Sequence, residues 1–270
     1  MTGSFLDTTV VVHMAEGLQL ERLKGEAFVA AHQPAEAPVY ALRELLAGRV
    51  RVICDAHNKL QASENIGEAL LALLSLSPAE GRKRESKIQA LSQSLAEAFI
   101  KNPTGERNDL KREILQDLAL KVARLWNKAH KISGVSIVQS LACFNDGDLA
   151  FGRAGELRGP GDSFNCIKEE RCAAAAYIYD NKNNLVQMIA ALHPNNLPPV
   201  VANKKENQQR RKALKDLQAN GPSKFNKSLC RAIGDAYFAA MCPAGSVVAT
   251  SNLVDHLPLC LSLGKVAKEP

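Results

Sequence analysis

The stretch that decides the fold is GDAYFAAMCPAGSVVATSNLVDHLPL, residues 234–259. Its pattern predicts a helix, a Pro/Gly turn, the short apolar strand SVVAT and the start of a second helix. Asp235 stands at the start of the first helix, and Asp255 lies just past the strand. Because open α/β sheets bind ligands beyond the carboxyl ends of their strands, we expect both carboxylates at one edge of a parallel sheet.

A third carboxylate lies near the N-terminus, in SFLDTTVVVHM, residues 4–14. The β-branched, apolar character of this segment predicts a buried strand. Asp7 lies inside it, and a buried carboxylate is costly unless a cation or hydrogen-bond donors meet it. We therefore expect Asp7 to join Asp235 and Asp255 at the same sheet edge.

The remaining chain alternates predicted strands and helices, which favours a parallel sheet covered on both faces. Residues 39–54 predict a short helix closed by Gly48 and then a strand, whereas apolar residues at helical spacing dominate 55–133. A Gly-rich loop follows at 147–161. The predicted fold class is α/β: a three-layer sandwich with a central twisted parallel sheet flanked by helices, plus a helical insertion.

Composition excludes several classes of protein. With 270 residues, 46% hydrophobic and 23% charged, the chain resembles an ordinary globular protein rather than a collagen, a coiled coil or a disordered chain. It has no apolar run of 18 residues and no positively charged leader, so we expect a cytoplasmic protein without a membrane partner. The seven cysteines contain no C-x-x-C pair, which argues against a zinc ribbon and favours reduced, buried thiols.

The positive charge is concentrated in one segment. The whole chain carries +6, yet Val200–Arg231 alone holds nine basic and two acidic residues. Such a stripe attracts phosphate backbones, although a solvated lysine-rich helix face is the alternative. The candidate phosphate-binding residues in this segment are Lys204, Lys205, Arg210, Arg211, Lys212 and Lys215.

Three motifs together resemble the PIN-domain superfamily of metal-dependent nucleases. They are L-D-T-x-V from Leu6, G-D-A-x-x-A-A from Gly234, and T-x-N-x-x-D from Thr250, the last followed by H-L-P-L. The resemblance covers residues 1–30 and about 160–265. It implies a PIN-like nuclease domain formed by 1–54 and 160–270, with 55–159 as a helical insertion and loop.

The resemblance also implies a site with four acids that binds Mg²⁺ or Mn²⁺ to hydrolyse RNA phosphodiesters. The motifs place three acids at Asp7, Asp235 and Asp255, with Thr250 and Asn252 in the polar turn before the last. Oxygen ligands suit hard Mg²⁺, and the ion activates water and offsets charge on the phosphate. The remaining acid is assigned to Glu170, with Glu169 and then Glu44 as rivals.

The function implied is therefore a cytoplasmic ribonuclease with RNA as its partner. Many small PIN proteins are toxins held silent by an antitoxin, so the resemblance also permits an antitoxin or another protein partner, and a homodimer. The first alternative is a non-catalytic PIN-like module that binds RNA or protein, with the insertion as its docking surface. A weaker one is a doubly wound enzyme that acts on a small phosphate substrate.

Overall fold

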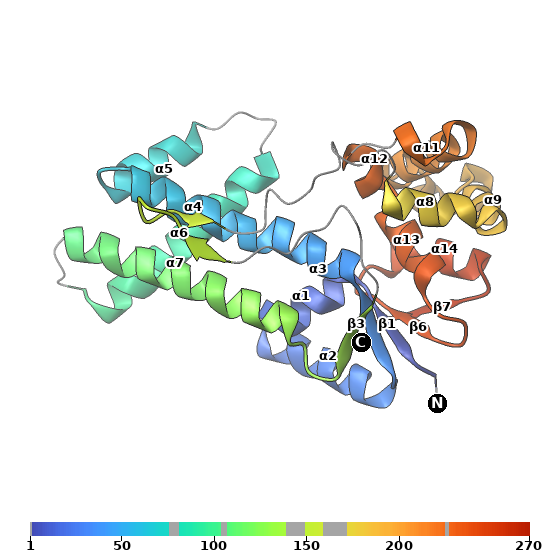
Figure 1. Ribbon diagram of the computed structural model, residues 1–270, viewed down its shortest axis with the longest axis horizontal. Coiled ribbons are helices and arrows are strands. Elements are labelled where there is room, and N and C mark those ends of the chain that lie inside the picture. Colours follow the sequence, from blue (N-terminus) through green and yellow to red (C-terminus); the bar gives the residue numbers. More distant parts are fainter. Residues whose placement is uncertain (1, 76–80, 104–106, 139–148, 159–171, 225–226) are drawn as a thin grey trace. The chain divides into compact units, whose positions relative to one another are not determined.

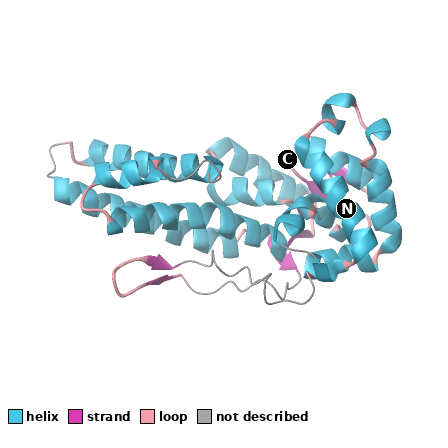
Figure 2. Cartoon of the chain, turned by 90° about the horizontal axis from the view of Figure 1, so that it is seen from above, coloured by secondary structure: helices cyan, strands magenta, loops and turns pink. Residues whose placement is uncertain are grey.

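The computed structural model describes residues 2–75, 81–103, 107–138, 149–158, 172–224 and 227–270. Helices make up most of the described chain, and the strands are few and short (Figure 2). The chain forms two compact units. Unit 1 comprises Met1–Arg43, Lys131–Asn145 and Ser163–Pro270; unit 2 comprises Glu44–His130 and Asp146–Asp162.

Unit 1 is built on a five-stranded, entirely parallel sheet, so the predicted three-layer α/β class is confirmed (Figure 1). The strands follow the order β3-β2-β1-β6-β7. Their bounds are Ser4–Leu6 for β1, Ala35–Pro38 for β2, Val135–Val138 for β3, Val247–Ala249 for β6 and Val266–Lys268 for β7. Strand β3 lies inside the predicted 55–159 insertion but belongs to this sheet.

The strand order creates a switch point between β1 and β6. From β1 the chain moves outward through β2 to β3, whereas β6 and β7 lie on the other side of β1. Since parallel crossovers are right-handed, helices α1 and α2 cover one face and α14 covers the other. Figure 1 shows α1 and α2 on one side of the strands and α13 and α14 on the other. Open sheets of this kind bind ligands at the switch point.

The first strand is shorter than predicted. Only Ser4–Leu6 is a strand, and a helix begins at Thr8, so the prediction of a strand over residues 4–14 is wrong beyond Leu6. The Asp7 side chain accepts a hydrogen bond from the Thr8 backbone N–H at 2.7 Å and so caps the helix. The cap, together with burial of Val10 on the inner helix face, outweighs the β propensity of the segment.

The helices of unit 1 pack around the sheet, and Phe238 lies at the centre of the packing. Its ring meets Phe5 at 6.5 Å between centroids and Tyr40 at 5.8 Å. The helices are α1 (Thr8–Glu16), α2 (Gln19–Ala31), α3 (Val39–Leu45, which continues into unit 2), α8 (Ala173–Asp180), α9 (Lys182–Ala191), η4 (Pro194–Asn196), α10 (Pro199–Ala202), α11 (Lys205–Asn220), η5 (Pro222–Lys224), α12 (Lys227–Ala232), α13 (Gly234–Met241) and α14 (Leu253–Ser262).

Lys265 fastens the end of α13 to the loop before β7. Its ammonium donates hydrogen bonds to the carbonyl oxygens of Ala239, Ala240 and Cys242 at 2.8, 2.9 and 2.6 Å. These carbonyls belong to the C-terminal end of α13, where the helix leaves its last acceptors unpaired and where positive charge is favoured. Burial lowers the pKa of Lys265. The contact fixes the helix that carries Asp235.

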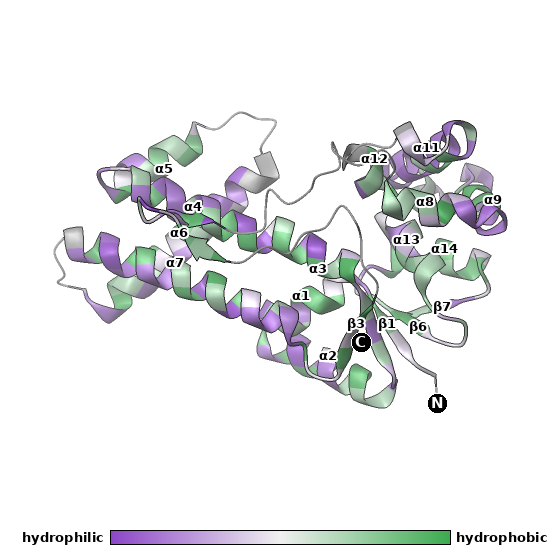
Figure 3. Ribbon diagram, viewed as in Figure 1, coloured by the Kyte–Doolittle hydropathy of each residue, from purple (hydrophilic) through white to green (hydrophobic). Residues whose placement is uncertain are grey.

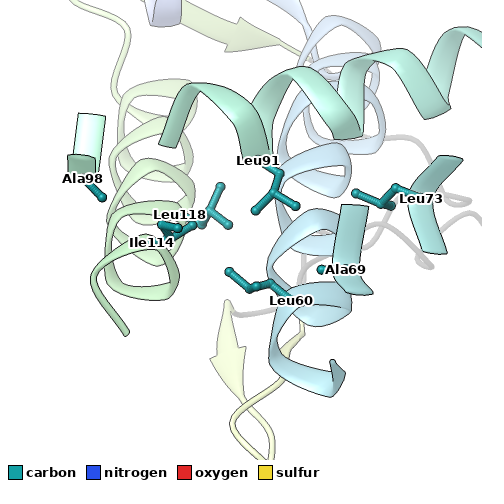
Figure 4. Packing of buried hydrophobic residues seen from close by; sticks show 7 residues of the cluster. All are labelled: Leu60, Ala69, Leu73, Leu91, Ala98, Ile114 and Leu118. Atoms are coloured by element: carbon teal, nitrogen blue, oxygen red, sulfur yellow. The ribbon is translucent and has the colours of Figure 1, made fainter. Parts of the chain in front are cut away.

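Unit 2 is a bundle of helices with its own apolar core. Its elements are η1 (Leu46–Val50), α4 (Arg51–Ala62), α5 (Ile66–Leu74), α6 (Gly81–Lys101), α7 (Arg107–His130), and the short strands β4 (Ala150–Phe151) and β5 (Leu157–Arg158). Figure 4 shows Leu60, Leu91 and Leu118, from three helices, pointing toward one another in this core. Hydrophilic and hydrophobic residues alternate along α7, as an amphipathic helix requires (Figure 3).

Two predictions within this region are corrected by the structure. The expected strand near residue 51 is helical, because the chain continues through Gly48 in a single π-helical turn and buries Cys54, His57 and Leu60 on one face of α4. The predicted loop at 147–161 includes the β4–β5 hairpin.

The side-chain amide of Asn58 makes the two shortest hydrogen bonds between α4 and the β4–β5 hairpin, and Gln61 adds a third to the Ala154 carbonyl at 3.3 Å. The Asn58 Nδ2 atom donates to the Leu157 carbonyl at 2.9 Å, and Asn58 Oδ1 accepts from the Leu157 N–H at 2.7 Å. The amide therefore takes the place of a neighbouring strand.

Two general features complete the fold. The cysteines within the described ranges, Cys54, Cys172, Cys230, Cys242 and Cys260, are buried and form no disulfide with one another. No helix among the described residues combines the length and apolarity needed to cross a membrane.

Candidate active site

Asp7 stands at the carboxyl end of β1 and is almost fully buried. While Oδ1 caps α1, Oδ2 accepts hydrogen bonds from the hydroxyls of Thr9 at 2.8 Å and Thr250 at 2.9 Å. Thr250 directly follows β6. Asp7 and Thr250 therefore join the carboxyl ends of the two strands that flank the switch point.

The turn after β6 is organised by the same threonine. The backbone N–H of Asn252 donates to Thr250 Oγ1 at 2.9 Å, and the Asn252 side chain donates to Asp255 Oδ2 at 2.6 Å. The other oxygen of Asp255 is buried without a hydrogen bond and lies 4.0 Å from Lys204 Nζ. Asp255 thus faces Asn252 and Lys204.

His256, in the first turn of α14, lies between the other two predicted acids. Its Nε2 atom is 3.4 Å from Asp7 Oδ2 and 3.4 Å from Asp235 Oδ1. The edge of the Phe238 ring packs against the imidazole, with centroids 6.0 Å apart and planes at 66°. Only 1% of His256 is exposed, so packing fixes the direction of Nε2.

Asp235 is held by a second cation, Arg210, on the buried face of α11. The guanidinium donates to Asp235 Oδ2 and also to Asn207 Oδ1. Arg210 is 4% exposed, whereas the Asp235 side chain keeps 26% of its surface exposed. One carboxylate oxygen therefore faces Arg210 while the other faces His256.

The protonation of the His256–Asp235 pair follows from these contacts. Burial opposes the charged form of His256, but hydrogen bonds and charge from Asp235 and Asp7 outweigh it and raise the pKa to about 10. Burial likewise disfavours ionised Asp235, yet the His256 hydrogen bond and the Arg210 charge lower its pKa to about 2. At neutral pH an imidazolium lies between two carboxylates.

Three potential metal ligands converge here: Asp7, Asp235 and His256 each offer one atom within 4.8 Å of the others. Ligand atoms on opposite sides of an ion, at about 2.1 Å each, lie about 4.2 Å apart. The two carboxylates and the imidazole therefore fit a divalent cation with little movement, provided that His256 gives up its proton.

The structure brings two of the four predicted acids, Asp7 and Asp235, into this cluster. The third ligand atom comes from His256 rather than from its neighbour Asp255, and sequence reasoning missed it. The sequence offered one signal for His256, namely its position in the first turn of a helix that directly follows a strand of the sheet. Glu169 and Glu170 lie outside the described residues, and Glu44 lies on α3 as the first residue of unit 2.

The predicted basic stripe divides between two faces of α11 and the residue before it. Arg210 points inward to Asp235 and is not a solvent-facing phosphate contact in this arrangement. Lys204 precedes the helix and faces Asp255, and Lys205 is exposed. Arg211, Lys212 and Lys215 line a pocket beside α11.

Comparisons of the chain with family models, curated proteins and solved structures return no match.

Proposed function

We propose that this chain is a metal-dependent ribonuclease that holds its ion with Asp7, Asp235 and His256. The observation that carries the proposal is the convergence of three ligand atoms within 4.8 Å at the switch point of a parallel sheet. The motif resemblance to PIN domains and the cations of α11 beside the cluster support it further. RNA is the proposed substrate, because a cationic helix next to the ligands attracts a phosphate backbone.

The donor set favours Mn²⁺ over Mg²⁺. Mg²⁺ prefers an all-oxygen environment, whereas an imidazole nitrogen adds affinity for transition metals. When bound, such an ion lowers the pKa of a water molecule and offsets negative charge on the phosphate.

The side chains around the proposed metal site have distinct roles. Asp7 supplies a carboxylate whose position is fixed by Thr9 and Thr250, and His256 supplies Nε2 once it is neutral. Arg210 keeps hold of Asp235 Oδ2, so that Oδ1 stays directed toward the cluster. Lys204, 38% exposed and beside Asp255, is placed to attract the incoming phosphate.

A non-catalytic RNA-binding module is the second candidate, and one observation favours it. His256 and Arg210 supply two positive charges to Asp7 and Asp235, so the cluster is charge-balanced without an added ion. In that case the cluster stabilises the fold and α11 alone provides the binding activity.

Cleavage and metal binding separate the two candidates. We would incubate the purified full chain with single-stranded RNA in Mn²⁺, Mg²⁺ or EDTA, and measure Mn²⁺ binding by calorimetry. The ribonuclease proposal expects cleavage in Mn²⁺, less in Mg²⁺ and none in EDTA. Asp235→Asn should abolish cleavage and weaken Mn²⁺ binding, whereas Asp109→Asn, the same change at an exposed site of unit 2, should do neither.

Two outcomes would overturn the proposal. One is RNA cleavage by Asp235→Asn at the parental rate. The other is absence of cleavage by the parent across a broad RNA panel, which would leave the binding module. If cleavage is found, Glu44→Gln, Glu169→Gln and Glu170→Gln in the same assay identify which of the three predicted glutamates contributes.

A further inference from the structure

A pocket of about 220 Å³ lies in unit 1 between α11 and the segment from the end of α9 to α10. One wall is apolar and consists of Leu192, Pro194 and Ala202. The opposite wall is a single face of α11, formed by Gln208, Arg211, Lys212 and Lys215, with Asn207 beside them. The pocket thus combines an apolar surface with amides and three cations.

The three cations of this pocket have no ion-pair partner among the residues that the structure describes. Among the described residues, Arg211, Lys212 and Lys215 form no ion pair, and the Arg211 Nε atom is buried without a hydrogen bond. Lys212 and Lys215 are three residues apart on a helix, and Arg211 and Lys215 are four apart, spacings at which like charges repel. A bound anion would relieve this repulsion and pair with the buried nitrogen.

Asn207 connects the pocket to the metal-ligand cluster. Its Nδ2 atom donates to the Val201 carbonyl at 2.9 Å, while its Oδ1 atom accepts from Arg210, which in turn holds Asp235. Arg210 and Arg211 are consecutive, so one side chain serves the cluster and the next serves the pocket. The pocket and the cluster are therefore linked through one hydrogen-bonded side chain and two consecutive residues of α11.

We infer that this pocket binds one nucleotide of the RNA strand. The base lies against Leu192, Pro194 and Ala202, and the adjoining phosphate pairs with Arg211, Lys212 and Lys215. Flat bases favour an apolar surface, and the exposed amide of Gln208 offers hydrogen bonds to base edges. The identity of the ligand as RNA rests on the proposed ribonuclease function, but occupation of the pocket is measured without cleavage.

The decisive variant fills the pocket and leaves its charge unchanged. Binding of a fluorescent single-stranded RNA is measured by anisotropy in EDTA, so that no metal-dependent cleavage intervenes. Ala202→Leu should weaken binding by about tenfold or more, because a well-fitted pocket tolerates little added volume. Ala219→Leu, the same change at an exposed site of α11, should leave binding unchanged. Circular dichroism and thermal unfolding verify that each variant is folded.

Charge variants test the phosphate half of the pocket. Arg211→Gln with Lys215→Gln should reduce the log–log salt slope of RNA binding by about 1.4, at about 0.7 per lost contact. Lys205→Gln, also on α11 but outside the pocket, removes one charge and should change the slope by less than half as much. Equal losses per removed charge for pocket and control variants would overturn the inference, since they indicate general electrostatic attraction.

Competition identifies the source of the ligand. A nucleoside 5′-monophosphate should compete with the RNA better than either inorganic phosphate or the nucleoside alone, because it supplies both the base for the apolar wall and the phosphate for the cations. If the pocket is instead a site for free mononucleotides, it should bind the monophosphate, and Ala202→Leu should leave RNA affinity unchanged. That result would overturn the inference that the pocket binds a nucleotide of an RNA strand. If the pocket variants keep both parental RNA affinity and RNA cleavage, only this inference is contradicted. If the parent binds RNA in the pocket but does not cleave it, only the ribonuclease proposal is contradicted.

Discussion

The Nε2 atom of His256 lies 3.4 Å from the Oδ1 atom of Asp235, and the contact favours the charged form of both side chains. His256 is buried and Asp235 largely so, and each depends on the opposite charge of the other to remain ionised.

The metal-free protein should lose stability as the pH rises above neutrality. His256 has a pKa of about 10 in the folded state against 6.5 ordinarily, so its contribution is complete below pH 6.5 and is lost as the pH approaches 10. The free energy of unfolding should fall by up to about 1.4 kcal/mol per pH unit across this window. Asp235, with a pKa of about 2 against 3.8, contributes fully above pH 3.8 and loses its contribution toward pH 2.

Urea unfolding in EDTA at a series of pH values measures this dependence. His256→Gln should flatten the decline between pH 6.5 and 10, since other groups that titrate there are unchanged. A decline as steep in His256→Gln as in the parent would show that the imidazolium is not its source.

Arg210 is predicted to be a structural cation rather than an RNA contact. Arg210→Met leaves Asp235 and Asn207 without their shared donor, and removal of one partner of a buried ion pair costs about 3 kcal/mol or more. Lys205→Met, at an exposed position of the same helix, should change stability by no more than about 0.5 kcal/mol. Chemical unfolding of both variants checks this, and similar midpoints would refute a structural role for Arg210.

Replacement of Lys265 should lower the stability of the protein far more than replacement of Lys268 on β7. Lys265→Met removes three hydrogen bonds from the end of α13, and we expect a loss of about 2–3 kcal/mol. Lys268→Met, at an exposed site, is the matched control. Since α13 carries Asp235, the variant should also weaken Mn²⁺ binding. Thermal unfolding and calorimetry measure the two effects, and parental values in both would contradict this account.

Asn58→Ala should release the β4–β5 hairpin from α4. The change removes both hydrogen bonds to the Leu157 backbone, at a cost of about 2 kcal/mol. Proteolysis within residues 150–158 should accelerate. Gln61→Ala, which removes a single 3.3 Å bond to the Ala154 carbonyl, should have a smaller effect. Equal cleavage rates in the parent and Asn58→Ala would show that other contacts hold the hairpin.

The parallel sheet and the meeting of Asp7 with Asp235 follow from a general rule, because parallel strands end at one edge and both acids stand at element ends. The local structure around Asp7 was harder to predict. The β-branched run after it favours a strand by propensity, and the hydrogen bond to the Thr8 N–H together with the burial of Val10 makes the helix preferable.

Two other features depend on how helices pack against one another. His256, rather than Asp255, turns toward the acids because its ring meets Phe238, a contact between the successive helices α13 and α14. Arg210 turns inward because Asn207, Arg210, Leu214 and Leu217 share the buried face of α11. The spacing of Arg210 from Leu214 and Leu217, four and seven residues, was the available signal that it shares their buried face.

Asp7 has two roles, since one carboxylate oxygen starts α1 and the other belongs to the ligand cluster. A ligand that binds Oδ2 therefore also changes how readily the first turn of the helix that begins at Thr8 unfolds. The amide hydrogens in the first turn of α1 should exchange with solvent more slowly when the cluster is occupied. Hydrogen exchange at these few backbone positions would thus report whether the ligand cluster is occupied, without any substrate or turnover.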